Sequence, residues 1–127
     1  MNSFLLVGLG GALGSMARYG VSILMGRTFS TAFPVSTLLV NVLGSLAMGM
    51  FVGLMARLLP DWQAEARLIV AVGLLGGFTT FSSFSLDTII LIERGALAQA
   101  IGYVALSVVV CLAGLYLGLL ITRGGTA

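Results

Sequence analysis

The chain is divided into four long apolar stretches by short polar connections. A helix needs about 20 mostly apolar residues to cross a bilayer, and the stretches that reach this length are 4–26, 34–57, 67–93 and 96–122. The connections between them leave no room for a separate folded domain. We therefore expect an all-α membrane protein in which residues 1–127 form one transmembrane domain of four helices.

Composition agrees with a lipid environment. Hydrophobic residues make up 59% of the chain and charged residues 8%, whereas soluble domains carry about 25% charged residues. The apolar N-terminus lacks a basic leading segment, so we interpret it as a retained span rather than a cleaved signal. The six basic residues are scattered arginines rather than the clustered patch typical of nucleic-acid binding. Without histidine or an arranged pair of carboxylates, we do not expect an enzyme.

The arginines give the chain little reason to prefer one orientation in the membrane. Four spans place both termini on one side, together with Arg57, Arg67 and Arg123, while Arg27 and Arg94 fall on the other. Orientation normally follows an excess of basic residues on the cytoplasmic side. Two interpretations stay open at this point: a single, weakly oriented topology, or a dual topology in which oppositely inserted copies pair as an antiparallel homodimer.

Each span also carries two glycines four residues apart, a spacing that lets membrane helices approach closely. These pairs are Gly10 and Gly14, Gly49 and Gly53, Gly73 and Gly77, and Gly114 and Gly118. They predict tight helix packing and specify no partner.

Polar residues interrupt the first two spans. Arg18 lies inside the first span, where it either reaches the interface or marks a functional site, and in both cases favours anions at one entrance. Asn41 forms a helical stripe with Thr37 and Ser45. This stripe either joins helices by hydrogen bonds or forms a wetted wall in which the amide donates to a solute.

The third span has the most unusual pattern. Gly76 and Gly77 are followed by a run rich in hydroxyl residues near the middle of the span. This favours a broken helix, which is tolerated at membrane depth only where it is buried or lines a cavity. Freed carbonyls suit a hard cation, and the start of the next half-helix suits an anion. Phe81 and Phe84 share one face of that half-helix, either as packing residues or as part of the site.

The fourth span carries a weaker signal. Tyr103, Ser107 and Cys111 are spaced by four residues and form a mildly polar stripe on one helix face. Tyr103 alone would also suit an interfacial anchor.

With these residues in view, the sequence resembles the CrcB/Fluc family of fluoride channels. The resemblance covers nearly the whole chain and lies in GGALGSMARY, TLLVNVLGS and above all GGFTTFSSFSLD. It implies passive fluoride conduction by an antiparallel, dual-topology homodimer with two pores and a central structural sodium ion. A bacterial inner membrane is the implied location.

The resemblance also implies roles for individual residues. The backbone carbonyls of Gly76 and Thr79 would bind sodium, the ring edges of Phe81 and Phe84 would contact fluoride, and Asn41 would coordinate it from the pore wall. The other implied positions are Arg18 in the vestibule and Ser82, Ser85, Thr37, Tyr103 and Ser107 along the pore.

The main alternative is a small multidrug-resistance-type exporter of cations, which also has four spans. Proton-coupled export of that kind needs a carboxylate at depth, typically in the first span. This chain has none there, and Asp87 and Glu93 lie toward the end of the third span. A purely structural assembly factor would explain the glycine pairs and leave the interrupted third span without a purpose.

Overall fold

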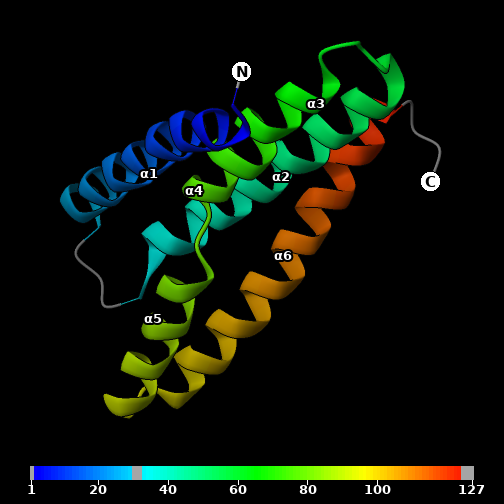
Figure 1. The fold of residues 1–127 in the computed structure, drawn as a ribbon. Helices are drawn as coiled ribbons and strands as arrows, with labels where there is room; N and C mark the ends of the chain where they lie inside the picture. The colour runs from blue at the N-terminus through cyan, green and yellow to red at the C-terminus, as the bar shows by residue number, and fades with distance from the viewer. Residues whose placement is uncertain (1, 30–32, 124–127) are drawn as a thin grey trace.

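The computed structural model describes residues 2–29 and 33–123, and all the regular structure in them is helical (Figure 1). In chain order the elements are α1 (Ser3–Thr28), α2 (Val35–Leu58), α3 (Gln63–Ala66), η1 (Arg67–Leu75), α4 (Gly76–Phe78), α5 (Phe81–Glu93) and α6 (Leu97–Arg123). The elements α3, η1 and α4 follow one another without a gap, and η1 is a wider π-helix, a form often found near functional sites.

The predicted four spans are confirmed. Within the described residues, four helical segments are long and apolar enough to cross a membrane: α1, α2, the run Gln63–Glu93 and α6. The third begins four residues before the predicted position 67, because the polar turn Gln63–Ala66 already has helical backbone. The prediction of an all-helical protein with four spans therefore holds.

The four spans pack as two close pairs. α1 lies along η1 and α4, and α2 lies along α6 for most of its length (Figure 1). Glycines make both contacts possible: a Cβ added at Gly14 would overlap the Leu74 carbonyl, and one added at Gly49 would overlap the Leu115 carbonyl. The predicted role of the glycine pairs in tight packing is thus confirmed at these positions.

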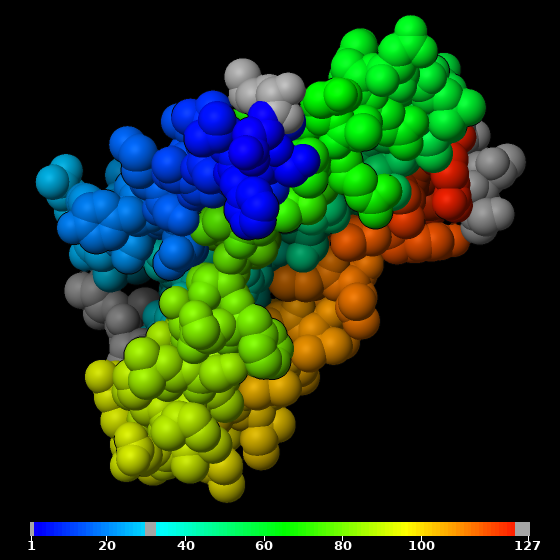
Figure 2. All heavy atoms as spheres, viewed as in Figure 1, coloured from blue at the N-terminus to red at the C-terminus, as the bar shows by residue number. Residues whose placement is uncertain are grey.

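The second half of the third span leaves the first half and joins the fourth. Figure 2 shows α5 and the beginning of α6 projecting away from the part of the molecule built by α1 and η1. A small core holds the projecting part together, with Leu91, Ala100 and Tyr103 buried at its centre. Most large apolar side chains elsewhere face outward, as expected where lipid is the solvent.

Candidate functional site

The third span leaves the helical conformation at two residues. α4 ends at Phe78, and Thr79 (φ −85°, ψ 158°) and Thr80 (φ −153°, ψ 121°) have extended backbones before α5 begins at Phe81. Gly76, which with Gly77 was expected to disfavour a continuous helix, lies inside α4 instead. The departure from the helix therefore falls on the two threonines rather than on the glycine pair.

Thr80 starts the following helix as its N-cap. Its Oγ1 accepts a hydrogen bond from the Ser83 amide at 3.2 Å, which satisfies one of the free donors at the start of α5. The same oxygen lies 3.2 Å from the Ser82 hydroxyl. Because threonine is a favoured N-cap residue, the local sequence accounts for the start of α5 at this turn.

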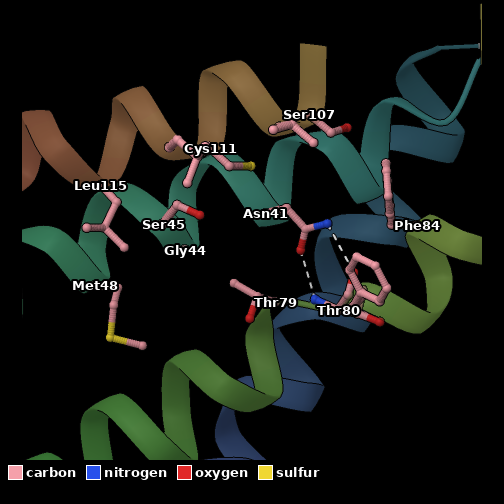
Figure 3. Close-up of a pocket in the computed structure, with 13 residues that line it drawn as sticks. Asn41, Gly44, Ser45, Met48, Thr79, Thr80, Phe84, Ser107, Cys111 and Leu115 are labelled. Carbon is pink, nitrogen blue, oxygen red and sulfur yellow. Dashed lines mark hydrogen bonds between the residues drawn. The ribbon is translucent and has the colours of Figure 1, made fainter. Parts of the chain in front are cut away.

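Side chains from the first two spans bind the backbone on either side of this point. Arg18 on α1 donates from Nε to the Gly77 carbonyl at 3.1 Å. Asn41 on α2 accepts from the Thr80 amide at 2.8 Å and donates from Nδ2 to the Thr80 carbonyl at 3.1 Å (Figure 3). The structure thus brings two predicted site residues, Arg18 and Asn41, to the interruption of the third span.

A cavity of about 460 Å³ opens beside Asn41, between α2, the extended residues, α5 and α6 (Figure 3). Its lining residues are Asn41, Gly44, Ser45, Met48, Thr79, Thr80, Phe81, Phe84, Ser107, Val108, Cys111, Leu112 and Leu115. Amide and hydroxyl groups gather near the interruption, and apolar side chains line much of the rest. We call this space the amide cavity.

A second cavity, of about 270 Å³, lies on the Arg18 side. Its walls are mostly polar and consist of Ser15, Arg18, Tyr19, Ser22, Ser36, Thr37, Val40, Thr80 and Ser83. We call it the arginine cavity. Among the described residues, Thr80 is the one common to the linings of these two cavities.

Aromatic rings connect α5 with α6 beside the amide cavity. The ring centroids of Phe81 and Phe84 are 5.5 Å apart, and those of Phe84 and Tyr103 are 5.1 Å apart. Phe81 is 79% exposed, so its ring is open to the surroundings of this single chain, while Tyr103 is fully buried. The Tyr103 hydroxyl donates to Asp87 Oδ2 at 3.1 Å.

Two of the three residues in the predicted polar stripe of the fourth span lie at the site. Ser107 and Cys111 line the amide cavity, and the Ser107 hydroxyl is buried with no hydrogen-bond partner in the described structure. Tyr103 instead lies in the small core below, where it pairs with Asp87. Ser85 turns back to its own helix and donates to the Phe81 carbonyl at 3.0 Å.

The two residues predicted to bind a cation differ in their surroundings. Gly76 is exposed, and a Cβ added there would meet only the Ala71 carbonyl, at 3.5 Å. Thr79 lines the amide cavity, and its hydroxyl donates to the Leu75 carbonyl at 2.9 Å. Residues 2–29 and 33–123 contain no cluster of three His, Cys, Asp or Glu side chains suited to a metal, so a cation here would depend on backbone carbonyls.

Sequence reasoning missed several residues of the site. Thr80 lines both cavities and caps α5 by accepting from the Ser83 amide, Ser83 also lines the arginine cavity, and Asp87 is the acceptor of Tyr103. The favoured N-cap chemistry of threonine was a usable signal for Thr80. No local signal paired Asp87 with Tyr103, because the two residues lie on different helices.

The fold and the two cavities define the chain as a multi-pass membrane protein with a polar site at an interrupted span. Residues 5–119 match the family described as CrcB-like protein, Camphor Resistance (CrcB), and the chain belongs to this family. It is 53% identical over 123 residues to a protein of Paracoccus denitrificans named fluoride-specific ion channel FluC, covering 97% of this chain and 96% of that one. A protein of the same name from Rhodospirillum centenum is 47% identical over 129 residues, with both chains covered completely. The matched relatives are bacterial, and the chain is a multi-pass bacterial membrane protein.

Proposed function

We propose that this chain forms a fluoride-selective channel that conducts the anion passively and lowers the fluoride concentration of the cytoplasm. The relatives that match it over nearly its full length are named fluoride-specific ion channels. The observation that carries the proposal is the interruption at Thr79 and Thr80, because it brings an amide, hydroxyls and phenyl rings to one cavity and an arginine to the next.

This set of groups suits a small, strongly hydrated anion. A pore must replace the water around the ion and must still release it. Hydroxyl and amide hydrogens and the positive edges of phenyl rings offer many weak contacts. The arginine is at the interruption of the span, and the amide cavity has no charged side chain among its lining residues. A strong cation at the narrowest point would hold fluoride instead of passing it.

Within this proposal, fluoride enters through the arginine cavity and passes along the amide cavity. Arg18 raises the local anion concentration, with Thr37 beside it. Asn41, Phe81 and Phe84 then contact the ion along the amide cavity. Ser107 adds a hydroxyl donor in the amide cavity. The proposed roles of Ser82, Ser85 and Tyr103 require their hydroxyls to turn toward the ion from the hydrogen bonds they make in the single chain.

The functional unit that we propose is an antiparallel homodimer of dual topology with two pores. Three features support it: the near balance of arginines between the two sides, the exposed Phe81 ring beside the cavity, and the exposed Gly76 on the face next to the interruption. In such a dimer the open side of the amide cavity is closed by the partner subunit. The proposed location is the bacterial inner membrane.

We also propose a structural sodium ion at the centre of this dimer. The Thr80 amide donates to Asn41 rather than continuing the helical bond to Gly76, which frees the Gly76 carbonyl on an exposed surface. The carbonyls of Gly76 and Thr79 from both subunits are hard oxygen ligands that would hold the ion. The positive charge of this ion would attract carbonyl oxygens of both subunits and so hold the two subunits together.

The test is release of ions from liposomes that contain the purified protein. A potassium ionophore lets potassium leave with the anion, so that no membrane voltage builds up to stop the efflux. Under this condition fluoride-loaded vesicles should empty rapidly, and chloride-loaded vesicles should retain their contents. Proton-driven release of cationic dyes without fluoride release would favour the exporter and overturn the proposal.

A further inference from the structure

Three hydrogen bonds from neighbouring helices converge on the interruption of the third span. Arg18 reaches the Gly77 carbonyl from α1, with Nε and O 3.1 Å apart. Asn41 reaches Thr80 from α2 and binds both its amide (2.8 Å) and its carbonyl (3.1 Å). The first span therefore binds the backbone just before the interruption, at Gly77, and the second span binds its last residue, Thr80.

These bonds take the place of two bonds of a continuous helix. In an α-helix, the amide of Thr80 would donate to the Gly76 carbonyl and that of Phe81 to the Gly77 carbonyl. Here the Thr80 amide donates to Asn41 instead, and the Gly77 carbonyl accepts from Arg18 instead. Because the bilayer interior offers no water to unpaired backbone groups, these contacts favour the interrupted backbone over a continuous helix.

Pairing also fixes the direction of the Asn41 amide. Its Oδ1 faces an N–H donor and its Nδ2 faces a carbonyl, so a flipped amide would place donor against donor and acceptor against acceptor. One hydrogen of Nδ2 remains unused by Thr80. Arg18 likewise spends only Nε on Gly77, which leaves four of its five N–H donors for other partners.

Thr80, the residue that Asn41 binds, is shared by the two cavities. Thr80 lines both the arginine cavity and the amide cavity, and its hydroxyl caps α5, the helix that carries Phe81 and Phe84. A shift of Thr80 would therefore change both cavities and the direction of the two rings at once.

We propose that Arg18 and Asn41 are positioning residues that hold the interruption in place and fix the position of Thr80, the residue shared by the two cavities. Asn41 thus acts on the backbone in addition to any contact with an ion. Arg18 has two separate tasks, a structural one through Nε and an electrostatic one through its other donors. The clamp itself is a property of the fold, and its effect on conduction rests on the proposed function.

Hydrogen exchange at single amides tests the Asn41 half of the clamp without any ion flux. In Asn41→Ala, exchange of the Thr80 amide should accelerate about fivefold, the effect of losing roughly one net hydrogen bond. The neighbouring Thr79 amide is the internal control, because it donates to the Leu75 carbonyl at 3.0 Å and does not involve Asn41. Asn41→Asp keeps an acceptor for the Thr80 amide but sets its second oxygen against the Thr80 carbonyl, so it should retain more protection than Asn41→Ala and less than the wild type. It gives a second variant if Asn41→Ala does not fold.

Fluoride release from liposomes tests the Arg18 half. Arg18→Lys keeps the positive charge but replaces the planar guanidinium by one ammonium group, which cannot bind Gly77 at Nε and face the cavity at the same time. We expect Arg18→Lys to release fluoride as slowly as the neutral Arg18→Gln. Arg27→Lys, near the end of the same helix and outside both cavities, is the matched control and should behave as the wild type.

Two results would overturn the clamp. One is unchanged protection of the Thr80 amide in Asn41→Ala, and the other is wild-type release by Arg18→Lys. If the wild-type protein released no fluoride, the proposed function would fail, and the exchange of the Thr80 amide would still decide whether Asn41 holds the interruption.

Discussion

Replacing Gly118 by alanine should separate the two helices that form the wall of the amide cavity. A Cβ at this position of α6 would lie 2.5 Å from the Leu46 carbonyl oxygen and 2.6 Å from the Met50 amide nitrogen. Favourable contacts of a carbon atom need about 3.5–4.0 Å, so α2 and α6 must move apart by roughly 1 Å at this point. Overpacking of this kind costs about 1–3 kcal/mol.

Gly102→Ala is the matched control on the same helix. A Cβ at Gly102 would meet nothing within 4 Å, so this change should only remove the conformational freedom of glycine and stabilise the helix by about 0.5–1 kcal/mol. The difference between the two variants isolates the contact between α2 and α6, because both replace a glycine of α6 by alanine.

The assay is reversible unfolding in mixed micelles with increasing dodecyl sulfate. Trp62, the only tryptophan of the chain, reports the transition by its fluorescence. Gly118→Ala should unfold at a lower fraction of the denaturing detergent than the wild type, and Gly102→Ala at an equal or higher fraction. Equal shifts in the same direction for both variants would refute the packing argument.

Three further predictions concern the site. Phe81→Ile and Phe84→Ile should each reduce fluoride release, because they replace a phenyl edge by an aliphatic group. Their elution volume in size-exclusion chromatography should stay that of the wild type. Wild-type release by both variants would show that the rings do not contact the ion. Tyr103→Phe removes the hydrogen bond to Asp87 and should lower the free energy of unfolding by about 0.6–1.7 kcal/mol, whereas Tyr116→Phe, at a partly exposed position of the same helix, should change it far less. Replacing all sodium by N-methylglucamine during purification should weaken dimer assembly, and an unchanged dimer would remove the support for a structural cation.

The spans could be predicted from the sequence because they depend on composition. Four apolar stretches with few charges leave no other solvent than lipid, and backbone pairing inside lipid requires helices. The glycine contacts were predictable in kind, since only small residues allow such close approach. Which helix each glycine would meet depends on the whole packing, and the sequence contains no local sign of it.

The position of the interruption was harder to predict. Gly77 looked like a weak point of the helix, but it serves packing, with the Gly11 carbonyl 2.7 Å from the place where its Cβ would be. The extended backbone at Thr80 is instead hydrogen-bonded to Asn41, a partner 39 residues away in the sequence. Local propensity does not contain this information, because the donor and the acceptor come from different spans.

The candidate site was found where polar residues stood out against an apolar background. Arg18 and Asn41 were identified for that reason, and the structure brings both to the third span. Their hydrogen bonds to the backbone could not be read from the sequence, because they require the geometry of three helices. Asp87 was judged to lie too far from the centre of the span, and it was missed as the partner of Tyr103.

The most direct test of the central proposal is the reversal potential of currents through the purified protein in a planar bilayer. With a fluoride gradient and equal chloride on both sides, the account predicts an ohmic current that reverses at the Nernst potential of fluoride. A reversal potential that follows chloride or a cation, or the absence of any current under a fluoride gradient, would contradict it.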